Sequence, residues 1–379
     1  MKRLLQVTPV LWFFLFAQLA QADWTPAKRL TWNSGLSIGP AIAVDSSGGL
    51  HVVWRDYTPE NWEIYYKKST DGGANWSSTQ RITWAAGDSS EPDIAVDISD
   101  NLHVVWHESS GEVYYKRSMD GGTSWTSSQR LTRTSGLSNV PDIAVDSSGN
   151  LHVVWDDNTP GSVEIYYKKS TDVGTSWTSS QRLTWTSGGS FVPAIGVDSA
   201  DDLHVVWRDY TPGNYDIYHK SSTDGGDHWT TSRRLTWNSG DSYVRSIGVD
   251  SAAGLYIIWN DDSPGNMEIY HKRSTDGGAS WGTNQRLTWN SSYSGGPDLA
   301  VDASDNIHAV WRDDMSGNME IYYRKSTDGG AHWTAGRRLT WTSGLTQNPA
   351  LAVDSSGNIH VVWDNNGSGN AEIYYKKGS

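Results

Sequence analysis

The stretch Leu50-His51-Val52-Val53-Trp54 recurs along the chain in seven copies, as Val-Val-Trp or a close equivalent. The copies end at Trp54, Trp106, Trp155, Trp207, Trp259, Trp311 and Trp363, at spacings of 52, 49, 52, 52, 52 and 52 residues. A fixed period of this length indicates one supersecondary unit stacked on itself. Because residues present in every copy mostly serve the folding of each unit, the repeat predicts shape more directly than ligand.

Each copy predicts four short strands separated by turns. Between residues 40 and 84 the strands are PAIAVD (40–45), LHVVWRD (50–56), EIYYKKS (63–69) and QRITW (80–84). Val, Ile, Tyr and Trp fill the strands, and Gly, Pro, Asp, Asn and Ser fill the turns. Apolar residues point to both faces of such a sheet, and stacking around a central axis covers both. The chain is therefore predicted to be an all-β, seven-bladed β-propeller of four-stranded antiparallel blades.

The two ends of the chain are expected to complete one blade. Residues 1–22 begin Met-Lys-Arg, continue through an apolar stretch and end in Ala-Gln-Ala, which is typical of a secretory signal peptide; an uncleaved anchor is the alternative. Residues 23–379 then form a single propeller domain. The last copy has only three strands, and residues 23–32 match the missing fourth. Their pairing with residues 372–379 would remove an open sheet edge.

Composition narrows the possible partners. The chain has no cysteine, so burial alone must stabilise it outside the cytoplasm. Its formal net charge of −13 becomes −15 without Lys2 and Arg3, which disfavours nucleic acid and anionic membranes as partners. No cofactor or metal is indicated. Six histidines share one repeat position but are expected to lie too far apart for one ion and to form hydrogen bonds between blades instead: His51, His103, His152, His204, His308 and His360.

The turn before the fourth strand carries a family resemblance. STDGGANW (69–76) and its counterparts resemble the Asp-box, or bacterial neuraminidase repeat, of the sialidase-like superfamily. The resemblance implies a propeller in which the aspartate accepts turn N–H bonds and the glycines take positive φ. These structural aspartates are Asp71, Asp120, Asp172, Asp224, Asp276 and Asp328, and Val173 replaces a glycine in the third box. Sialidases are typically six-bladed with an Arg-Ile-Pro type motif, which this sequence lacks, so no catalytic residue is carried over.

Two sets of residues are candidates for ligand binding. Tryptophans that end the predicted fourth strands can stack on sugar rings, with Arg133 replacing the one in the second copy; they are Trp32, Trp84, Trp185, Trp237, Trp289 and Trp341. Residues that enter the first strands differ between copies and lie nearest the axis; they are Ile38, Glu91, Asn139, Phe191, Tyr243, Arg245, Tyr293, Gln347 and Asn348. Drift in solvated loops is the alternative for this second set.

Weaker candidates follow the second strands. Carboxylates such as Asp56 and Asp209 are interpreted as caps of the next turn, with general acids or a polyol-binding rim as the alternative. Arg55, Arg208 and Arg312 can converge on one anionic group, or each can pair with a nearby aspartate or with the acid that opens the third strand, Glu63, Asp216 or Glu320. Second-strand residues are expected to lie away from the axis, which argues against convergence. Tyr57 and Tyr210, each beside an acid, are the only candidates for a catalytic tyrosine.

The leading hypothesis is a secreted or periplasmic module that binds carbohydrate through several near-equivalent clefts. The alternatives are a sialidase-like exo-glycosidase, which needs one asymmetric pocket with a pair of catalytic groups, and an extracellular scaffold for another protein. The ligand and the oligomeric state stay open at this point.

Overall fold

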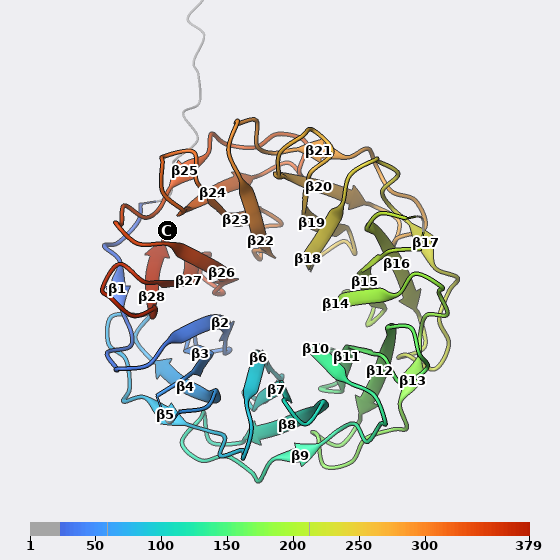
Figure 1. Ribbon diagram of the computed structural model, residues 1–379, viewed down its shortest axis with the longest axis horizontal. Helices are drawn as coiled ribbons and strands as arrows, with labels where there is room; N and C mark the ends of the chain where they lie inside the picture. Colours follow the sequence, from blue (N-terminus) through green and yellow to red (C-terminus); the bar gives the residue numbers. More distant parts are fainter. Residues whose placement is uncertain (1–22, 59, 212) are drawn as a thin grey trace, which may run out of the picture.

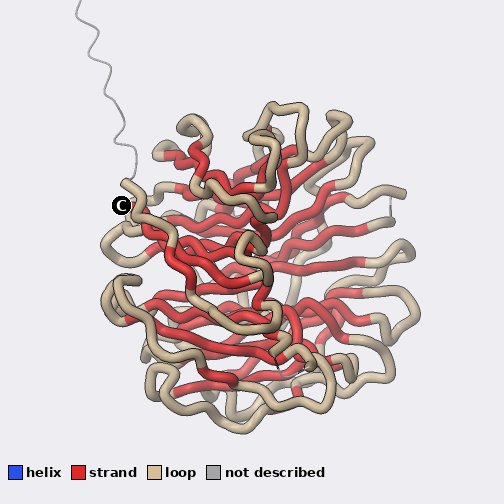
Figure 2. Tube along the Cα trace, turned by 60° about the vertical axis from the view of Figure 1, so that its left-hand side comes forward, coloured by secondary structure: helices blue, strands red, loops and turns tan. Residues whose placement is uncertain are grey.

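The computed structural model describes residues 23–58, 60–211 and 213–379, and the predicted signal peptide lies outside these residues. Seven four-stranded antiparallel sheets stand in a ring, with the first strand of each sheet nearest the axis (Figure 1). In this part of the chain the structure consists of strands and loops without a helix (Figure 2). Accordingly, none of the described residues belongs to a helix that is long and apolar enough to cross a membrane. The prediction of a seven-bladed β-propeller is confirmed.

The blades are numbered along the chain, and their strands have the following bounds. Blade 1 contains β2 (Ser37–Val44), β3 (Leu50–Asp56), β4 (Glu63–Ser69) and β5 (Gln80–Arg81); blade 2 contains β6 (Ser89–Val96), β7 (Leu102–Glu108), β8 (Glu112–Ser118) and β9 (Gln129–Arg130); blade 3 contains β10 (Ser138–Val145), β11 (Leu151–Asp157), β12 (Glu164–Ser170) and β13 (Gln181–Arg182); blade 4 contains β14 (Ser190–Val197), β15 (Leu203–Asp209), β16 (Asp216–Ser222) and β17 (Arg233–Arg234); blade 5 contains β18 (Ser242–Val249), β19 (Leu255–Asp261), β20 (Glu268–Ser274) and β21 (Gln285–Arg286); blade 6 contains β22 (Ser294–Val301), β23 (Ile307–Asp313), β24 (Glu320–Ser326) and β25 (Arg337–Arg338); blade 7 contains β26 (Thr346–Val353), β27 (Ile359–Asn365), β28 (Glu372–Gly378) and β1 (Lys28–Arg29).

Blade 7 closes the ring as predicted. The N-terminal strand β1 pairs with β28, so that Lys28 lies opposite Tyr375 and Arg29 opposite Tyr374. An isolated bridge between Trp24 and Gly378 extends the contact. The two ends of the described chain therefore share one sheet, in which β1 covers the edge of β28 that would otherwise be open.

The hydrophobic core lies between blades. One cluster joins Val53, Ile64 and Tyr66 of blade 1 to Val104 and Trp106 of blade 2, and six further clusters join the other neighbouring pairs. The second-strand tryptophans that define the repeat are at most 2% exposed. Since each sheet is apolar on both faces, neighbours on both sides remove that surface from water.

The fourth strands are shorter than predicted. Only two residues of the QRITW segment, Gln80 and Arg81, form a strand. The ladder ends because the Thr83 hydroxyl, rather than a backbone carbonyl, accepts the Ile64 N–H at 2.8 Å, while the Ile82 N–H still donates to the Ile64 carbonyl at 2.9 Å. Trp84 consequently leaves the sheet and is exposed.

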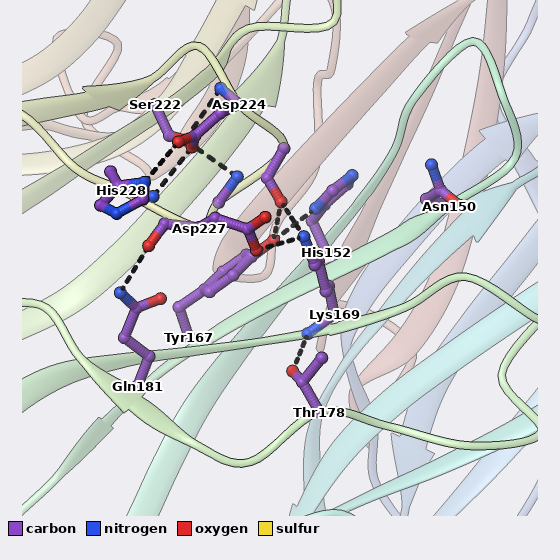
Figure 3. Close-up of polar contacts among 12 residues, drawn as sticks. Asn150, His152, Tyr167, Lys169, Thr178, Gln181, Ser222, Asp224, Asp227 and His228 are labelled. Carbon is purple, nitrogen blue, oxygen red and sulfur yellow. Dashed lines mark hydrogen bonds and ion pairs between the residues drawn. The ribbon is translucent and has the colours of Figure 1, made fainter.

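The Asp-boxes join each blade to the one before it, and Figure 3 shows the contact between blades 3 and 4. His152 lies between Asp146 (3.2 Å) and the Tyr167 hydroxyl (2.7 Å), and Tyr167 reaches the Gly225 carbonyl of the next Asp-box at 3.1 Å. Trp229 of that box packs edge-on against Tyr167, with ring centroids 5.1 Å apart. Burial lowers the pKa of His152, which keeps the ring neutral. Equivalent chains start at His51, His103 and His360, so the predicted hydrogen bonding between blades is confirmed for these three and for His152. His204 and His308 bond to His219 and Tyr323 of their own blades.

Within each box, the aspartate organises its own turn. Asp71 accepts the Asn75 N–H at 2.7 Å, and its hydrogen bonds, first that from the Asn75 backbone, lower its pKa to about 2. Val173 keeps the left-handed backbone that glycine has in the other boxes, with φ of 56°.

Deleting residues 23–32 is expected to destabilise the whole ring. The deletion removes the ion pair of Arg29 and the hydrogen bond of Thr31 with Glu372, and it takes Leu30 out of the core between blades 7 and 1, where burial of one leucine side chain is worth about 1.5–3 kcal/mol. Thermal unfolding should show a lower midpoint, and light scattering should show association through the bared edge of β28. A chain that lacks only residues 1–22 is the control. Equal midpoints for the two chains would contradict closure by β1.

Candidate functional site

The disc has two faces. The loop face carries the loops between second and third strands and the connections between blades, whereas the opposite face carries the Asp-boxes. On the loop face, Asp56 is fully buried, and it accepts hydrogen bonds from the Thr58 N–H at 2.9 Å and from the Ser37 hydroxyl at 2.7 Å. Asp209 makes the equivalent bonds and is 1% exposed. These contacts match the turn-capping interpretation and leave neither carboxylate open to a ligand.

The acids that open the third strands are also occupied. Glu63 is fully buried and accepts a hydrogen bond from Arg81 Nη2 at 2.6 Å. The other blades repeat this ion pair as Glu112–Arg130, Glu164–Arg182, Asp216–Arg234, Glu268–Arg286, Glu320–Arg338 and Glu372–Arg29. The prediction that Arg55, Arg208 or Arg312 pairs with these acids is therefore wrong, because a fourth-strand arginine already neutralises each of them.

An axial cavity of about 440 Å³ lies between the first strands of all seven blades. Glu91 and three aspartates line it. These aspartates, Asp93, Asp142 and Asp298, stand where the other copies have alanine or serine. Each accepts a backbone N–H from the next blade, from Ile143 at 3.0 Å, Ile195 at 2.7 Å and Leu351 at 2.8 Å, respectively. Burial raises the pKa of Asp298 to about 6, and burial, together with the neighbouring Asp93, raises that of Asp142 well above its ordinary value.

A second pocket of about 340 Å³, the mouth pocket, adjoins the axial cavity on the loop face. Arg208, Arg245 and Arg312 line it together with Glu91 and two tyrosines, Tyr243 and Tyr293. Arg55 lines the axial cavity instead. The expectation that second-strand residues stay away from the axis is wrong for these arginines, because a long side chain at the end of the second strand, next to the bulged first strand, reaches the cavities.

The structure thus brings four of the predicted specificity residues together, Glu91, Tyr243, Arg245 and Tyr293. Asn348 lines the axial cavity, and the Phe191 ring centroid lies 6.0 Å from the Arg208 guanidinium. Ile38, Asn139 and Gln347 line neither cavity.

Blade 5 supplies Arg245 through a local change of register. In blade 1, Ile38 pairs with Arg55 and Ala41 with Val53, so that Gly39 and Pro40 bulge out of the ladder. Proline suits this place because it donates no backbone N–H. In blade 5, Val244 stays paired with Trp259 and Arg245 alone bulges out, exposed to solvent. The substitution of Arg245 for proline therefore places one guanidinium in the mouth pocket.

Rim clefts form the second candidate site. This name denotes the surroundings of the six predicted tryptophans, which are 66–69% exposed: Trp32, Trp84, Trp185, Trp237, Trp289 and Trp341. At Trp32, the Arg29 guanidinium and Lys67 Nζ lie 5.8 and 5.4 Å from a ring centroid of the indole. Lys67 comes from the adjacent blade and donates to the Leu30 carbonyl at 2.5 Å. This cleft, of about 310 Å³, extends to Trp76 of the next Asp-box.

Tyr57 and Tyr210 line neither central cavity. Both are exposed on the loop face, and each packs against an aromatic neighbour, Trp62 at 5.3 Å and Tyr215 at 5.0 Å between ring centroids. No group of three or more His, Asp or Glu side chains among the described residues is placed to hold a metal ion.

Two sets of site residues escape the sequence reasoning. The axial aspartates carry a signal, since Asp93, Asp142 and Asp298 stand at one repeat position that is otherwise Ala or Ser. The cationic residues of the rim clefts carry a second signal, because Lys67 and its counterparts are lysine or arginine at the same third-strand position in all seven copies.

Comparison with known proteins shows the family and the fold. A family model described as a BNR repeat-like domain matches residues 96–287, just over half of the chain. Among curated protein sequences, none matches. A PL25 ulvan lyase bound to -[GlcA(1-4)Rha3S]- has a TM-score of 0.66 at 12% identity, over 92% of this chain and 95% of that chain.

Two glycosidase structures are also similar. The NanB sialidase from Streptococcus pneumoniae has a TM-score of 0.52 at 13% identity, over 92% of this chain and 70% of that one. The GH93 α-L-arabinofuranosidase of Fusarium graminearum with arabinobiose has a TM-score of 0.52 at 13% identity, over 90% and 92%. At these identities the similarity shows the fold alone.

Replacing Asp142 by Asn is expected to raise stability at pH 8 more than at pH 4.5. The folded state holds the Asp142 proton to a higher pH than the unfolded chain, whose pKa is about 3.8, so this group's contribution to the free energy of unfolding falls as pH rises above that value. Asn keeps the acceptor for the Ile195 N–H and does not ionise. Urea unfolding at both pH values measures the difference, with Glu60→Gln at an exposed side chain as the control. An equal effect of D142N at the two pH values would contradict the raised pKa.

Proposed function

Because the chain belongs to the BNR repeat-like domain family, a family of propellers, we propose that it is a multivalent carbohydrate-binding module. The observation that carries the proposal is the circle of six exposed indoles, one in each of six rim clefts. Twenty-two tryptophans occur in the chain, and those of the second strands are fully buried, so exposure of this set is specific to its position.

The chemistry of a rim cleft suits a sugar ring. A pyranose has an apolar C–H face that packs on an indole, and hydroxyl groups at its edge that need polar partners. At Trp84, Arg81 and Lys116 lie 5.6 and 5.3 Å from an indole ring centroid and fix the ring by cation–π contact. Because the indole is already held in place, it can stack on a sugar with little further loss of side-chain conformational entropy.

Several weak clefts on one rigid ring act together. A polysaccharide or a glycan-covered surface that engages two or more clefts gains apparent affinity through effective concentration. Arg133 occupies the seventh position, between blades 2 and 3, and an arginine offers no comparable stacking platform beside Lys168. Six of the seven clefts are therefore competent in this proposal.

The names of the structural neighbours support a carbohydrate ligand. The lyase was solved with a glucuronate–rhamnose sulfate unit and the arabinofuranosidase with arabinobiose. An extracytoplasmic location and a glycan partner belong to the same proposal. The sialidase-like exo-glycosidase and the protein scaffold remain its alternatives, and burial of Asp56 and Asp209 argues against these two carboxylates as catalytic acids of the enzyme.

Replacing Trp84 and Trp237 by Ala is expected to weaken carbohydrate binding in steps. Both indoles are about two-thirds exposed, so the fold should survive while two stacking platforms disappear. Glycan-array binding of residues 23–379 would identify the sugar, and titration onto the immobilised glycan should then show roughly a tenfold loss of apparent affinity for the double variant. Unchanged affinity would exclude these clefts.

A gain-of-binding variant provides the matched test. Arg133→Trp should restore the seventh cleft and strengthen binding, whereas Met119→Ala, at an exposed apolar residue on the Asp-box face, should change nothing. A fluorogenic sialoside assay run beside the glycan array distinguishes the binding module from the glycosidase, because turnover of the sialoside would favour the enzyme. Neither glycan binding nor turnover would favour the protein scaffold.

A further inference from the structure

The Asp-box of blade 5, residues 274–281, is bonded to the preceding blade differently from the other boxes. In the box of blade 4, the Gly225 carbonyl accepts hydrogen bonds from Tyr167 at 3.1 Å and from Lys169 at 2.9 Å, both of blade 3 (Figure 3). The boxes of blades 1, 2, 3 and 6 also receive at least two hydrogen bonds from the preceding blade, from Tyr375 and Lys28, Tyr66 and Lys68, Tyr115 and Arg117, and His271 and Arg273, respectively. Within the described residues, the box of blade 5 receives none from blade 4.

Two substitutions in blade 4 account for this difference. His219 takes the place of the tyrosine, and Ser221 the place of the cation, with which blade 3 reaches the next box. Instead, His219 Nε2 lies 3.3 Å from His204 Nδ1, and the Ser221 hydroxyl lies 3.4 Å from that of Thr230; both partners belong to blade 4. The Trp281 ring still packs edge-on against His219, with ring centroids 5.3 Å apart. Packing therefore holds this box to blade 4 without the hydrogen bonds.

The seam between blades 4 and 5, that is, the interface of these two neighbours, also lacks two other kinds of polar contact. The first is a clamp of two hydrogen bonds from a serine after the first strand to an aspartate of the next blade, and it occurs as Ser46–Asp100, Ser147–Asp201 and Ser251–Asp305. The second is an aspartate that accepts a first-strand N–H of the next blade, and it occurs at Asp93, Asp142, Asp298 and Asp364. In the part of the chain that the structure describes, every other seam has at least one of the three kinds of contact, whereas this seam has none.

The contacts that remain at this seam leave its Asp-box untied. A core cluster that includes Trp259 joins the two blades. At the loop face, the Tyr215 N–H donates to the Asp241 carboxylate at 2.8 Å, and further out Lys272 Nζ donates to the Leu235 carbonyl at 2.5 Å. Neither hydrogen bond involves the box of blade 5, so the seam is bonded at the loop face and is weakest at the opposite face.

We propose that the ring opens at the seam between blades 4 and 5, where the blade 5 Asp-box moves away from blade 4 while the loop-face contacts act as the hinge. Regions that are held by few hydrogen bonds open locally at a lower free-energy cost than the whole fold. Arg208 of blade 4 and Arg245 of blade 5 both line the mouth pocket, so the movement also changes the shape of that pocket.

Hydrogen–deuterium exchange of residues 23–379, followed by mass spectrometry, tests the proposal. The boxes make the same internal bonds, since the Gly278 N–H donates to the Ser274 hydroxyl at 2.9 Å and the Gly226 N–H to the Ser222 hydroxyl at 2.9 Å. A difference in amide exchange therefore reports opening of the seam rather than the internal bonds of the box. We expect the amides of residues 274–281 to exchange roughly tenfold faster than those of the blade 4 and blade 6 boxes.

Exchanging residues between blades 3 and 4 provides matched variants. His219→Tyr with Ser221→Lys supplies the donors that blade 3 has, and it should slow exchange in the blade 5 box to the rate of the blade 4 box. Tyr167→His with Lys169→Ser removes those donors from blade 3 and should make the blade 4 box exchange fast. Ser110→Lys, at an exposed residue on the loop face of blade 2, adds the same charge and should change neither box.

Three results would overturn the proposal. The first is equal exchange of the blade 4, 5 and 6 boxes in the unmodified chain. The second is fast exchange in the blade 5 box that persists in folded H219Y/S221K, because the missing donors would then not be its cause. The third is slow exchange in the blade 4 box of Y167H/K169S, which decides the question even where H219Y/S221K does not fold.

Discussion

The structure depends on one constraint, which is that each sheet is apolar on both faces and finds cover only in its two neighbours. All seven core clusters join residues of adjacent blades, and in each of them one blade contributes the second-strand tryptophan that defines the repeat. A blade in isolation would expose both faces, so the ring closes as a whole or not at all. The Asp–His–Tyr chains and the Asp-box tryptophans add polar and aromatic contacts at the same seams. The candidate sites also lie where blades meet, and for that reason no single repeat contains one.

The sequence predicts the structural features that are determined within one repeat. The period, the positions of the second and third strands and the closure of blade 7 follow from residues that are neighbours in sequence or occupy equivalent positions. The early end of the fourth strand before Trp84 is harder to foresee, because the Thr83 hydroxyl accepts the Ile64 N–H in place of a backbone carbonyl. Lys116 escapes the prediction for a related reason. It belongs to the next blade, and only the ring brings it to Trp84 and to the Ile82 carbonyl.

The mouth pocket is a feature that one repeat alone does not predict, because it depends on how different blades meet around the axis. The variable first-strand positions point to the correct end of the axis, but sequence alone does not say which copies face one another across it. Arg245 shows why: replacement of a proline moves the bulge by one residue, so that Val244 rejoins the ladder and only the arginine projects. The arginines after Trp207 and Trp311 reach the same space because their side chains are long, which a position on the second strand does not reveal.

Repeated and unique residues are therefore under different physical constraints. Glu112 is buried and bonded to Arg130, so a change there would disrupt a seam that supports its neighbours. Arg133, three residues further along, replaces a tryptophan without disturbing the bond between Lys168 and the Leu131 carbonyl at 2.5 Å, because the side chain at this position points into solvent. Positions at the bulges and at the ends of fourth strands can diverge at little cost in stability. In a closed ring of near-identical blades, these are the places where a rim of similar clefts and a single distinctive pocket can coexist.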